Sequence, residues 1–469
     1  MPNLQGQLVF IVIAAYLLAA VITIPARAIL RRSVHKLMMR AVPLPDVPPR
    51  DLRAEATPLR VEITPARDVA VSTDATSLLA SLRRSRVQSA LVSLLAGSVA
   101  AAIFAYGFLS EDGGGTMKQF LVVFTAYLWP VAITVFAVAA RTRFVRVVGL
   151  FVCALLILGI TAGVSGSVVI FGLSAFPTLA VLLILWLSRA LAPLVALFGA
   201  IAVMGLVLAT SVFGRSNPSL ACSIAILVVV AGVACAWIFV ALLVGAFERK
   251  WFGDLSFELG FLWATFAIWY MLVRGSTATW WYGLVALAAY TAITQIAWRV
   301  LRLGTSVNAG ANLLVLRVFD SKARGRRVFA ALGRMWDPVG PLHLIAGTDS
   351  AAANLDLAEA WRFLRMKIKS LYVRSKDDLD QRMAALDVKP DADGRYRTND
   401  FFCYAHTWKP TFTRLLDRSY AVLVDLGGFT KQNAGVSFEI GQLLARRPLE
   451  SIVLVANDRT DLGELTAVL

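Results

Sequence analysis

Charged residues are scarce in this chain, at 16% of 469 residues, whereas 58% are hydrophobic. Ordinary globular proteins carry about 25% charged residues, so the composition favours a polytopic membrane protein with a soluble portion. Acidic residues are the rarer sign, 30 against 46 lysines and arginines. Because the basic residues cluster beside the hydrophobic segments, as topology determinants do, we expect a lipid bilayer and not a nucleic acid as the partner.

Cysteine is also rare. The four residues Cys153, Cys222, Cys235 and Cys403 show no framework spacing, and the first three lie in apolar stretches. This pattern argues against a disulfide-stabilised fold. Cys403 and His406 have the spacing of half a zinc site, but no second pair completes it, so we expect no metal.

Ionisable residues are essentially missing from the centres of the hydrophobic segments. Such residues usually mark an ion or substrate pathway through a membrane protein. The absence argues against an energised transporter.

Long hydrophobic segments fill the first two thirds of the chain. Residues 7–26 form the first expected span, and Arg27, Arg31, Arg32, Lys36 and Arg40 follow it as a basic flank that closes a segment 1–40. Residues 41–86 are polar and rich in proline, so we expect a cytoplasmic connector. A bundle of about eight further helices follows over residues 87–302, with spans at 87–109, 119–140, 147–163, 168–187, 190–213, 220–247, 257–273 and 280–298.

The distribution of charge predicts the orientation of these spans. Basic residues fall in alternate loops, which places the amino terminus outside and the carboxyl-terminal domain in the cytoplasm of a cell with an inner membrane. The count of nine depends on a hairpin at residues 163–167 and becomes eight without it. The spacing of Gly159 and Gly163 would let two helices pack closely, so a homo-oligomer is one expectation about partners.

Residues 313–469 alternate short apolar runs with helical patterns, which predicts a soluble α/β doubly wound, Rossmann-like domain. We expect strands at residues 313–319, 342–346, 420–426 and 451–456. The expected helices are residues 321–335, 355–372, 376–386, 407–416 and 435–447.

Ligands of such sheets bind outside the carboxyl ends of the strands. The residues there form our candidate ligand-binding set: Asp320, Gly347, Thr348, Asp349, Gly427 and Gly428. Asp425 ends one strand and Glu439 lies on the next helix, so we expect the two carboxylates to converge on one pocket as catalytic residues. We expect the stretch 394–408 to form a loop over this pocket, where Arg397 and Asn399 would meet a phosphate.

The unit around Asp425 and Glu439 resembles two known families. A strand ending in Asp425, a Gly/Asn-containing loop and the run Phe438-Glu439-Ile440-Gly441 are similar to the signature of nucleoside 2-deoxyribosyltransferase-like proteins. The same arrangement resembles, more loosely, the TIR domain, and the tail as a whole resembles uncharacterised bacterial multi-span proteins with a TIR-like domain. The resemblance implies chemistry by Glu439 at the anomeric carbon of a ribose, with NAD or another nucleotide as substrate or ligand and no firmly implied cofactor.

Three functions are compatible with these patterns. The first is an enzyme that cleaves an N-glycosidic bond of NAD or a nucleoside, with Glu439 as nucleophile or stabiliser of the oxocarbenium ion and Asp425 orienting the sugar. The second is a membrane sensor that binds a nucleotide without turnover. The third is a transporter or channel with a regulatory tail.

Overall fold

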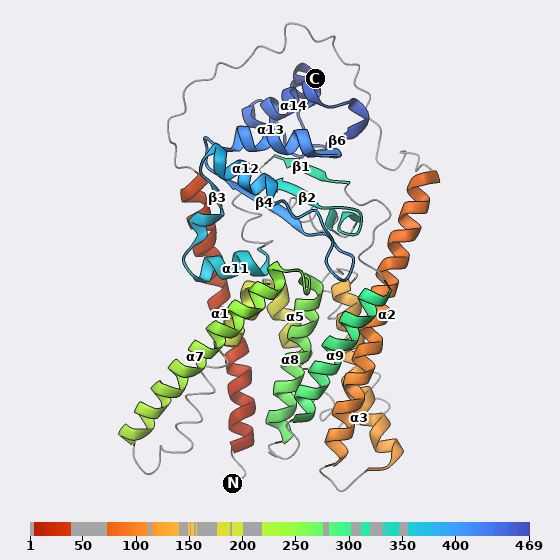
Figure 1. Cartoon of the computed structure of the whole chain (residues 1–469), viewed down its shortest axis with the longest axis vertical. Coiled ribbons are helices and arrows are strands. Elements are labelled where there is room, and N and C mark those ends of the chain that lie inside the picture. Colours follow the sequence, from red (N-terminus) through yellow and green to blue (C-terminus); the bar gives the residue numbers. More distant parts are fainter. Residues whose placement is uncertain are drawn as a thin grey trace. The chain divides into compact units, whose positions relative to one another are not determined.

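The computed structural model describes residues 4–38, 73–110, 115–139, 149–150, 152–153, 156, 176–187, 190–199, 218–274, 281–301, 311–318, 332–333, 335–346 and 355–469. These residues belong to two compact units. The first consists of Met1–Ala28, Arg86–Leu303 and Asn354–Leu364, and the second of Ile29–Ser85, Gly304–Ala353 and Arg365–Leu469. The first unit is helical, and the second contains the sheet (Figure 1).

Long helices precede the first strand of the chain. Those described are α1 (Leu4–Met38), α2 (Thr73–Ser110), α3 (Met117–Ala139), α5 (Phe176–Leu187), α7 (Pro218–Glu248), α8 (Asp254–Arg274) and α9 (Trp281–Val300). Four segments among the described residues are long and apolar enough to cross a membrane: Arg83–Ser110, Met117–Val135, Ile226–Glu248 and Trp281–Val300.

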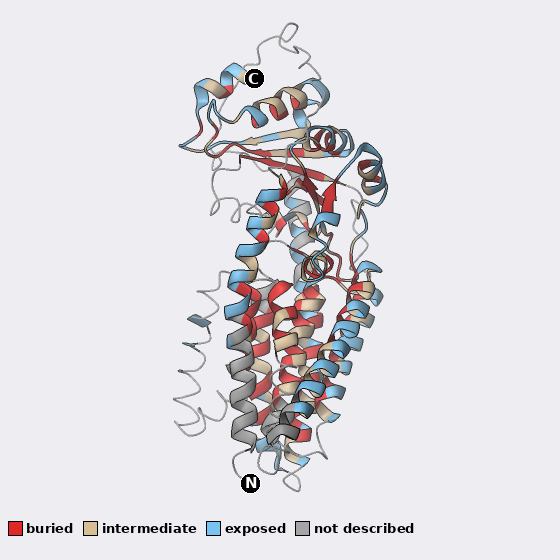
Figure 2. Cartoon of the chain, turned by 90° about the vertical axis from the view of Figure 1, so that its left-hand side faces the viewer, coloured by how far each residue is buried: buried red, intermediate tan, exposed pale blue. Residues whose placement is uncertain are grey.

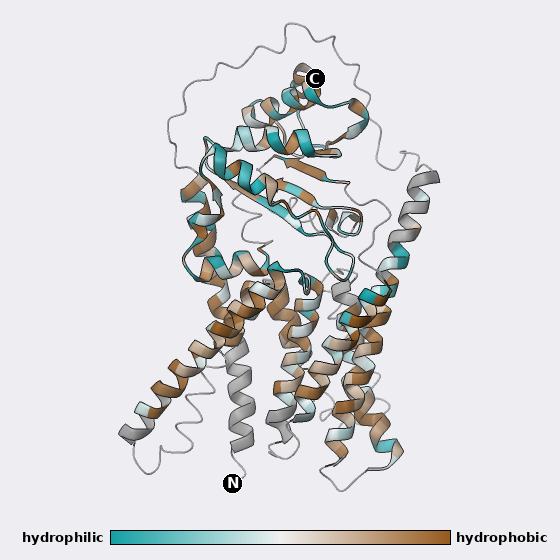
Figure 3. Cartoon of the chain, viewed as in Figure 1, coloured by the Kyte–Doolittle hydropathy of each residue, from teal (hydrophilic) through white to brown (hydrophobic). Residues whose placement is uncertain are grey.

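Helix α7 shows most clearly why the apolar helices of this unit are candidate membrane spans. Only 11% of its most apolar window is buried, and its exposed side chains include Ile226, Leu227, Phe239 and Leu242. Figure 3 shows apolar colouring along the helix, and Figure 2 shows how much of the helical surface is exposed. An exposed face that is apolar all along a helix would be unstable in water but is stable against lipid tails.

Aromatic packing forms the core of the helical unit. Phe104 of α2 stacks on Tyr127 of α3 at 5.1 Å and on Trp263 of α8 at 6.1 Å. Trp263 also packs on Tyr290 of α9 at 5.2 Å. Four helices therefore share one buried cluster, which fixes their mutual packing.

Helices occupy the residues expected as spans at 7–26, 87–109, 119–140, 220–247, 257–273 and 280–298. Four of these, 87–109, 119–140, 220–247 and 280–298, coincide with segments apolar enough to cross a membrane, and the spans at 7–26 and 257–273 stay predictions. The predicted hairpin at 163–167, the Gly159–Gly163 spacing and most of the connector lie outside the described residues. The choice between eight and nine spans therefore stays a prediction.

The second unit is built on a six-stranded parallel sheet in the order β3-β4-β2-β1-β5-β6. Its strands are β1 (Leu313–Arg317), β2 (Leu342–Ile345), β3 (Tyr372–Val373), β4 (Thr398–Cys403), β5 (Ala421–Asp425) and β6 (Ile452–Val455). The chain moves from β1 towards β2 on one side and reaches β5 and β6 on the other. The adjacent ends of β1 and β5 are thus a topological switch point.

One face of the sheet is covered by helices α12 (Lys376–Ala384), α13 (Trp408–Arg418), α14 (Ala434–Arg446) and α15 (Leu462–Val468) (Figure 1). The hydrophobic core on this face includes Leu314 and Leu316 of β1 and Val422 and Val424 of β5. Because side chains alternate along a strand, the residues between them point to the other face.

The structure corrects the predicted elements in three places. Strands β3 and β4 were not expected, and β4 occupies the stretch predicted as a loop over the pocket. The helix expected over residues 355–372 is shorter, because α11 (Leu357–Leu364) ends before a left-handed Met366 and a 3-10 helix, η4 (Ile368–Leu371). Helix α11 groups with the first unit, where Trp361 packs on Trp237 at 4.4 Å. Helix α15 was also missed.

Candidate functional site

The loop after β5 is a closed turn anchored by Asp425. The Asp425 side chain is 5% exposed, and its Oδ1 accepts a hydrogen bond from the Gly427 amide at 3.2 Å. Gly428 adopts a φ of 84°, which favours glycine, and the Phe429 amide then donates to the Leu426 carbonyl at 2.9 Å. Because Asp425 already holds the Gly427 amide, that amide is not available to a phosphate while the turn persists.

Arg317 is the neighbour of Asp425 across the switch point. The two residues are register partners of β1 and β5, and the Val318 amide donates to the Asp425 carbonyl at 3.1 Å. Register partners on parallel strands point to the same face, so a buried guanidinium and a buried carboxylate lie side by side. The sequence signal for Arg317 was one charge ending the apolar run of β1, and our reasoning missed it.

Glu439 lies on the side of α14 that packs against the sheet. Helix α14 buries Val436, Glu439, Ile440 and Leu443, and Glu439 is only 7% exposed. Within the described chain its carboxyl group makes no hydrogen bond or ion pair. Burial without a compensating partner disfavours the charged form and raises the pKa of Glu439 to about 8. The folded protein therefore holds Glu439 as a neutral acid near pH 7.

The two predicted catalytic acids occupy different layers. Val422 and Val424 face α14, so strand alternation turns Asp425 towards the opposite face. Glu439 belongs to the helical layer on the first face. The register of β1 and β5 makes Arg317, and not Glu439, the strand neighbour of Asp425. A ligand would reach both acids only across the carboxyl ends of β1 and β5, so their convergence stays a prediction.

Arg397 and Asn399 lie at the amino end of β4, on the side of the sheet opposite the carboxyl ends of the strands. Arg397 forms a two-pronged pair with Asp391, at 2.9 Å from Nε and 2.8 Å from Nη2. The Asn399 amide exchanges hydrogen bonds with the Asp387 backbone at 3.0 and 2.9 Å. The structure therefore does not bring these residues to the carboxyl edge, and it gives both of them structural partners.

The remaining predicted ligand residues, Asp320, Gly347, Thr348 and Asp349, lie outside the described residues. They follow β1 and β2 in the chain. Their part in a ligand site stays a prediction.

Two other titratable groups are held neutral in the core of the α/β unit. His343 on β2 is fully buried, neither ring nitrogen has a hydrogen-bond partner in the described chain, and burial lowers its pKa to about 4. Burial also raises the pKa of the Cys403 thiol to about 12. A neutral thiol is a poor zinc ligand, and no cluster of three metal-binding side chains occurs among the described residues.

The architecture defines a class: a helical unit with several apolar spans, followed by a parallel α/β unit whose charged pair lies at a switch point. Comparison with protein-family models, with curated proteins and with solved structures gave no match.

Proposed function

We propose that this protein is a membrane-anchored enzyme whose α/β unit cleaves an N-glycosidic bond of NAD or a nucleoside at the carboxyl edge of its sheet. The observation that carries the proposal is Glu439, an acid more than nine-tenths buried, without a partner in the described chain, on the helix that follows the switch point. Such a group is costly to a fold and is expected where function requires it.

Glu439 is a neutral acid in the folded protein, and the proposed reaction uses its ionised form. Cleavage of the bond between C1′ and a base nitrogen leaves positive charge on the ribose ring, and a carboxylate beside it stabilises that charge. The positive charge that develops on the ribose would lower the pKa of Glu439, and its proton would pass to solvent with NAD or to the departing base nitrogen with a nucleoside. The bonding electrons leave with the base, water then adds its oxygen to C1′ as a hydroxyl group, and the second proton of that water returns to the Glu439 carboxylate.

Arg317 and Asp425 would orient the substrate. A guanidinium is suited to a phosphate oxygen, and a carboxylate accepts hydrogen bonds from ribose hydroxyl groups. Both lie on β-strands, whose backbone holds them in fixed positions. A nucleotide bridging this pair and the start of α14 would bring its anomeric carbon near Glu439.

The distribution of charge supports the placement in the cell. Basic residues follow the first span, and loops with Arg141, Arg143, Arg249 and Lys250 alternate with loops that contain at most one arginine each. The positive-inside rule then puts the amino terminus outside, the α/β unit in the cytoplasm and the spans in a bacterial-type inner membrane. We also propose a second copy of the chain as a partner in a homo-oligomer.

A nucleotide sensor is the second candidate. The apolar neighbours of Glu439 on α14, Val436, Ile440 and Leu443, are all buried in the same core as the sheet. A carboxyl group enclosed in this way would suit a site that binds a nucleotide and changes shape without turning it over.

The test uses full-length protein in nanodiscs, incubated with NAD and a panel of nucleosides, with released base measured by mass spectrometry. Wild type and the control Glu450→Gln, which alters an exposed acid of the same unit, should release base. Glu439→Gln should reduce release by at least a hundredfold. Saturable binding without released base would select the sensor, and equal turnover by Glu439→Gln would remove Glu439 from the mechanism.

A further inference from the structure

A buried hydrogen bond joins the start of β3 to the end of α1. The Tyr372 hydroxyl group donates to the Val34 carbonyl at 3.1 Å, and Tyr372 is fully buried. Both residues belong to the second compact unit. The segment around Tyr372 is thereby fixed beside the last turns of the helix that carries the first predicted span.

The length of α1 places this contact relative to a bilayer. The predicted span ends at Ala26, and α1 continues unbroken to Met38. Val34 lies eight residues further along, which corresponds to about 12 Å of helix. The headgroup layer on each side of a bilayer is roughly 5–8 Å thick. If α1 crosses the bilayer as proposed, Val34 and Tyr372 lie roughly 4–7 Å outside the headgroup layer, a distance that lysine and arginine side chains can bridge.

Basic side chains gather on both partners of this contact. Helix α1 contains no acidic residue, and Arg31, Arg32 and Lys36 near its end are exposed. Residues 365–376 also contain no acidic residue, and their exposed basic side chains are Arg365, Lys367, Lys369, Arg374 and Lys376. We call these two groups together the basic collar.

An exposed apolar side chain projects from the collar. Met366 is 87% exposed and has a φ of 57°, an uncommon and strained conformation for a residue other than glycine. Within the described chain, no ion pair or hydrogen bond engages the ammonium groups of Lys367 and Lys369. An exposed methionine flanked by basic residues is poorly suited to water but well suited to the boundary between headgroups and acyl chains.

The collar keeps its positive charge because nearby acids are mostly occupied. Asp378 receives hydrogen bonds from Arg382 and from the Arg374 amide, and Asp380 pairs with Arg414 at 2.9 Å. Asp377 is the exposed acid next to the collar. Among the described residues, this one carboxylate faces the eight basic side chains of the collar, so the collar remains positive.

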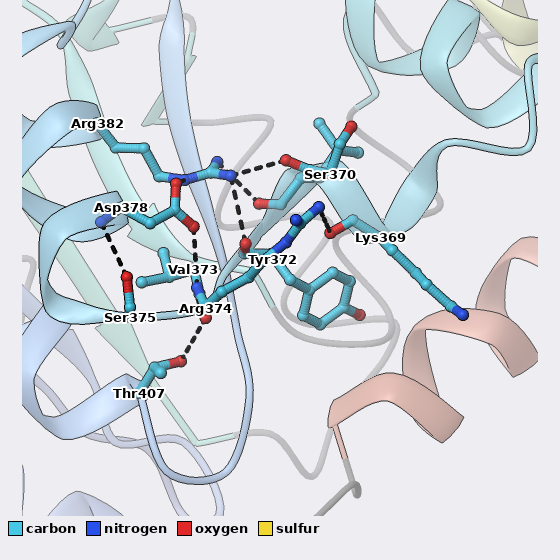
Figure 4. Close-up of polar contacts among 10 residues, drawn as sticks. Lys369, Ser370, Tyr372, Val373, Arg374, Ser375, Asp378, Arg382 and Thr407 are labelled. Carbon is cyan, nitrogen blue, oxygen red and sulfur yellow. Dashed lines mark hydrogen bonds and ion pairs between the residues drawn. The ribbon is translucent and has the colours of Figure 1, made fainter.

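Arg382 holds the segment in a fixed shape. Its guanidinium donates to the carbonyls of Ser370, Leu371 and Tyr372 at 2.7, 2.9 and 3.3 Å. Figure 4 shows Lys369 and the ring of Tyr372 extending together away from Arg382. Lys369 is thus presented on the same side of the segment as Tyr372, whose hydroxyl group contacts α1.

We propose that the basic collar binds the headgroups of anionic phospholipids, with Met366 entering the interface, and so holds the amino edge of the sheet at the membrane surface. The inference rests on the proposed crossing of α1 and is independent of any catalysis at the carboxyl edge. Each removed cation should weaken lipid binding about fivefold, and salt should weaken it further.

The test is hydrogen exchange of full-length protein in nanodiscs of neutral phosphatidylcholine or of phosphatidylcholine with anionic phosphatidylglycerol. Residues 365–372 should exchange more slowly in the anionic discs, and 0.5 M salt should reduce the difference. Lys367→Gln/Lys369→Gln should lose the protection, with roughly thirtyfold weaker retention of phosphatidylglycerol. The control Lys431→Gln/Arg459→Gln removes the same charge from loops after β5 and β6 and should behave as wild type.

Three outcomes would overturn the proposal. Equal protection in both kinds of disc would mean that protein, and not anionic lipid, covers the collar. If the control variant loses the same protection, the protection depends on the net charge of the protein and not on the collar. Protection that requires an added soluble polyanion would assign the collar to a different partner. Base release by the same nanodiscs is measured separately, so failure of the lipid site and failure of the proposed enzyme can be distinguished.

Discussion

Arg317 and Asp425 lie side by side at the carboxyl ends of the two strands where the sheet changes direction. Both are buried, and they carry opposite charges. A charged pair at this position costs desolvation energy that an apolar pair would not. This cost is consistent with the proposal that a ligand uses the two side chains.

Asp425→Asn tests this relationship through stability. The substitution removes the negative charge from the strand neighbour of the buried Arg317, so we expect a loss of about 3 kcal/mol. Unfolding of full-length protein in detergent, followed by protease sensitivity of the α/β unit, measures the change. The exposed control Asp377→Asn should be within about 0.5 kcal/mol of wild type, and equal behaviour of both variants would show that Arg317 does not depend on Asp425.

Glu439 should make the stability of the α/β unit depend on pH. Its pKa is about 8 in the folded protein and about 4.5 when exposed. The unfolded state therefore loses the proton first, and stability falls as pH rises from about 4.5 to 8, by on the order of 5 kcal/mol. Below pH 4.5 the penalty is absent.

Glu439→Gln should abolish this dependence because glutamine stays neutral throughout. At pH 8 the variant should be more stable than wild type, and near pH 4.5 the two should agree. The same protease assay across pH measures both proteins. A variant whose pH profile matches that of wild type would place the titration on another group.

Arg397→Ala should destabilise the protein without affecting ligand binding. Its pair with Asp391 is buried, with side chains 11% and 4% exposed, so removal strands a buried carboxylate at a cost of about 3 kcal/mol. Breaking the exposed pair of Arg414 and Asp380 should cost less than about 1 kcal/mol. Weaker nucleotide binding by folded Arg397→Ala would return this residue to the ligand site.

Arg382→Lys should loosen the segment from Ser370 to Tyr372. Lysine keeps the charge but cannot reach three carbonyls and Asp378 together. We expect faster hydrogen exchange over residues 368–375, corresponding to a local loss of about 2 kcal/mol. If exchange is unchanged from wild type, the conformation of η4 does not depend on the hydrogen bonds from Arg382.

The sequence predicted the parts of this fold that have strong periodic signals. The apolar runs of β1, β2, β5 and β6 and the amphipathic helices α12, α13 and α14 lie close to their expected positions. Strand β4 was missed because its first half, Thr398 to Asp400, is polar and only partly buried. Strand β3 has two residues, which is too short for any pattern to show.

The site was harder to predict than the fold because its geometry depends on pairing between distant strands. The positions of Asp425 and Glu439 at the end of a strand and on the next helix could be inferred locally. The neighbour of Asp425 could not, since Arg317 lies more than a hundred residues away and meets it only through the register of β1 and β5. Arg397 and Asn399 were expected in a loop over the pocket, whereas the structure places them at the amino end of β4, and their part in a ligand site stays a prediction.

The most direct test of the account is release of free base from NAD or a nucleoside by full-length protein in nanodiscs. We expect wild type to release base with a matching amount of ribosyl product, and Glu439→Gln to release at least a hundredfold less while still binding the substrate. Base release at the wild-type rate by Glu439→Gln, or no release by wild type with any member of the panel, would contradict the central claim.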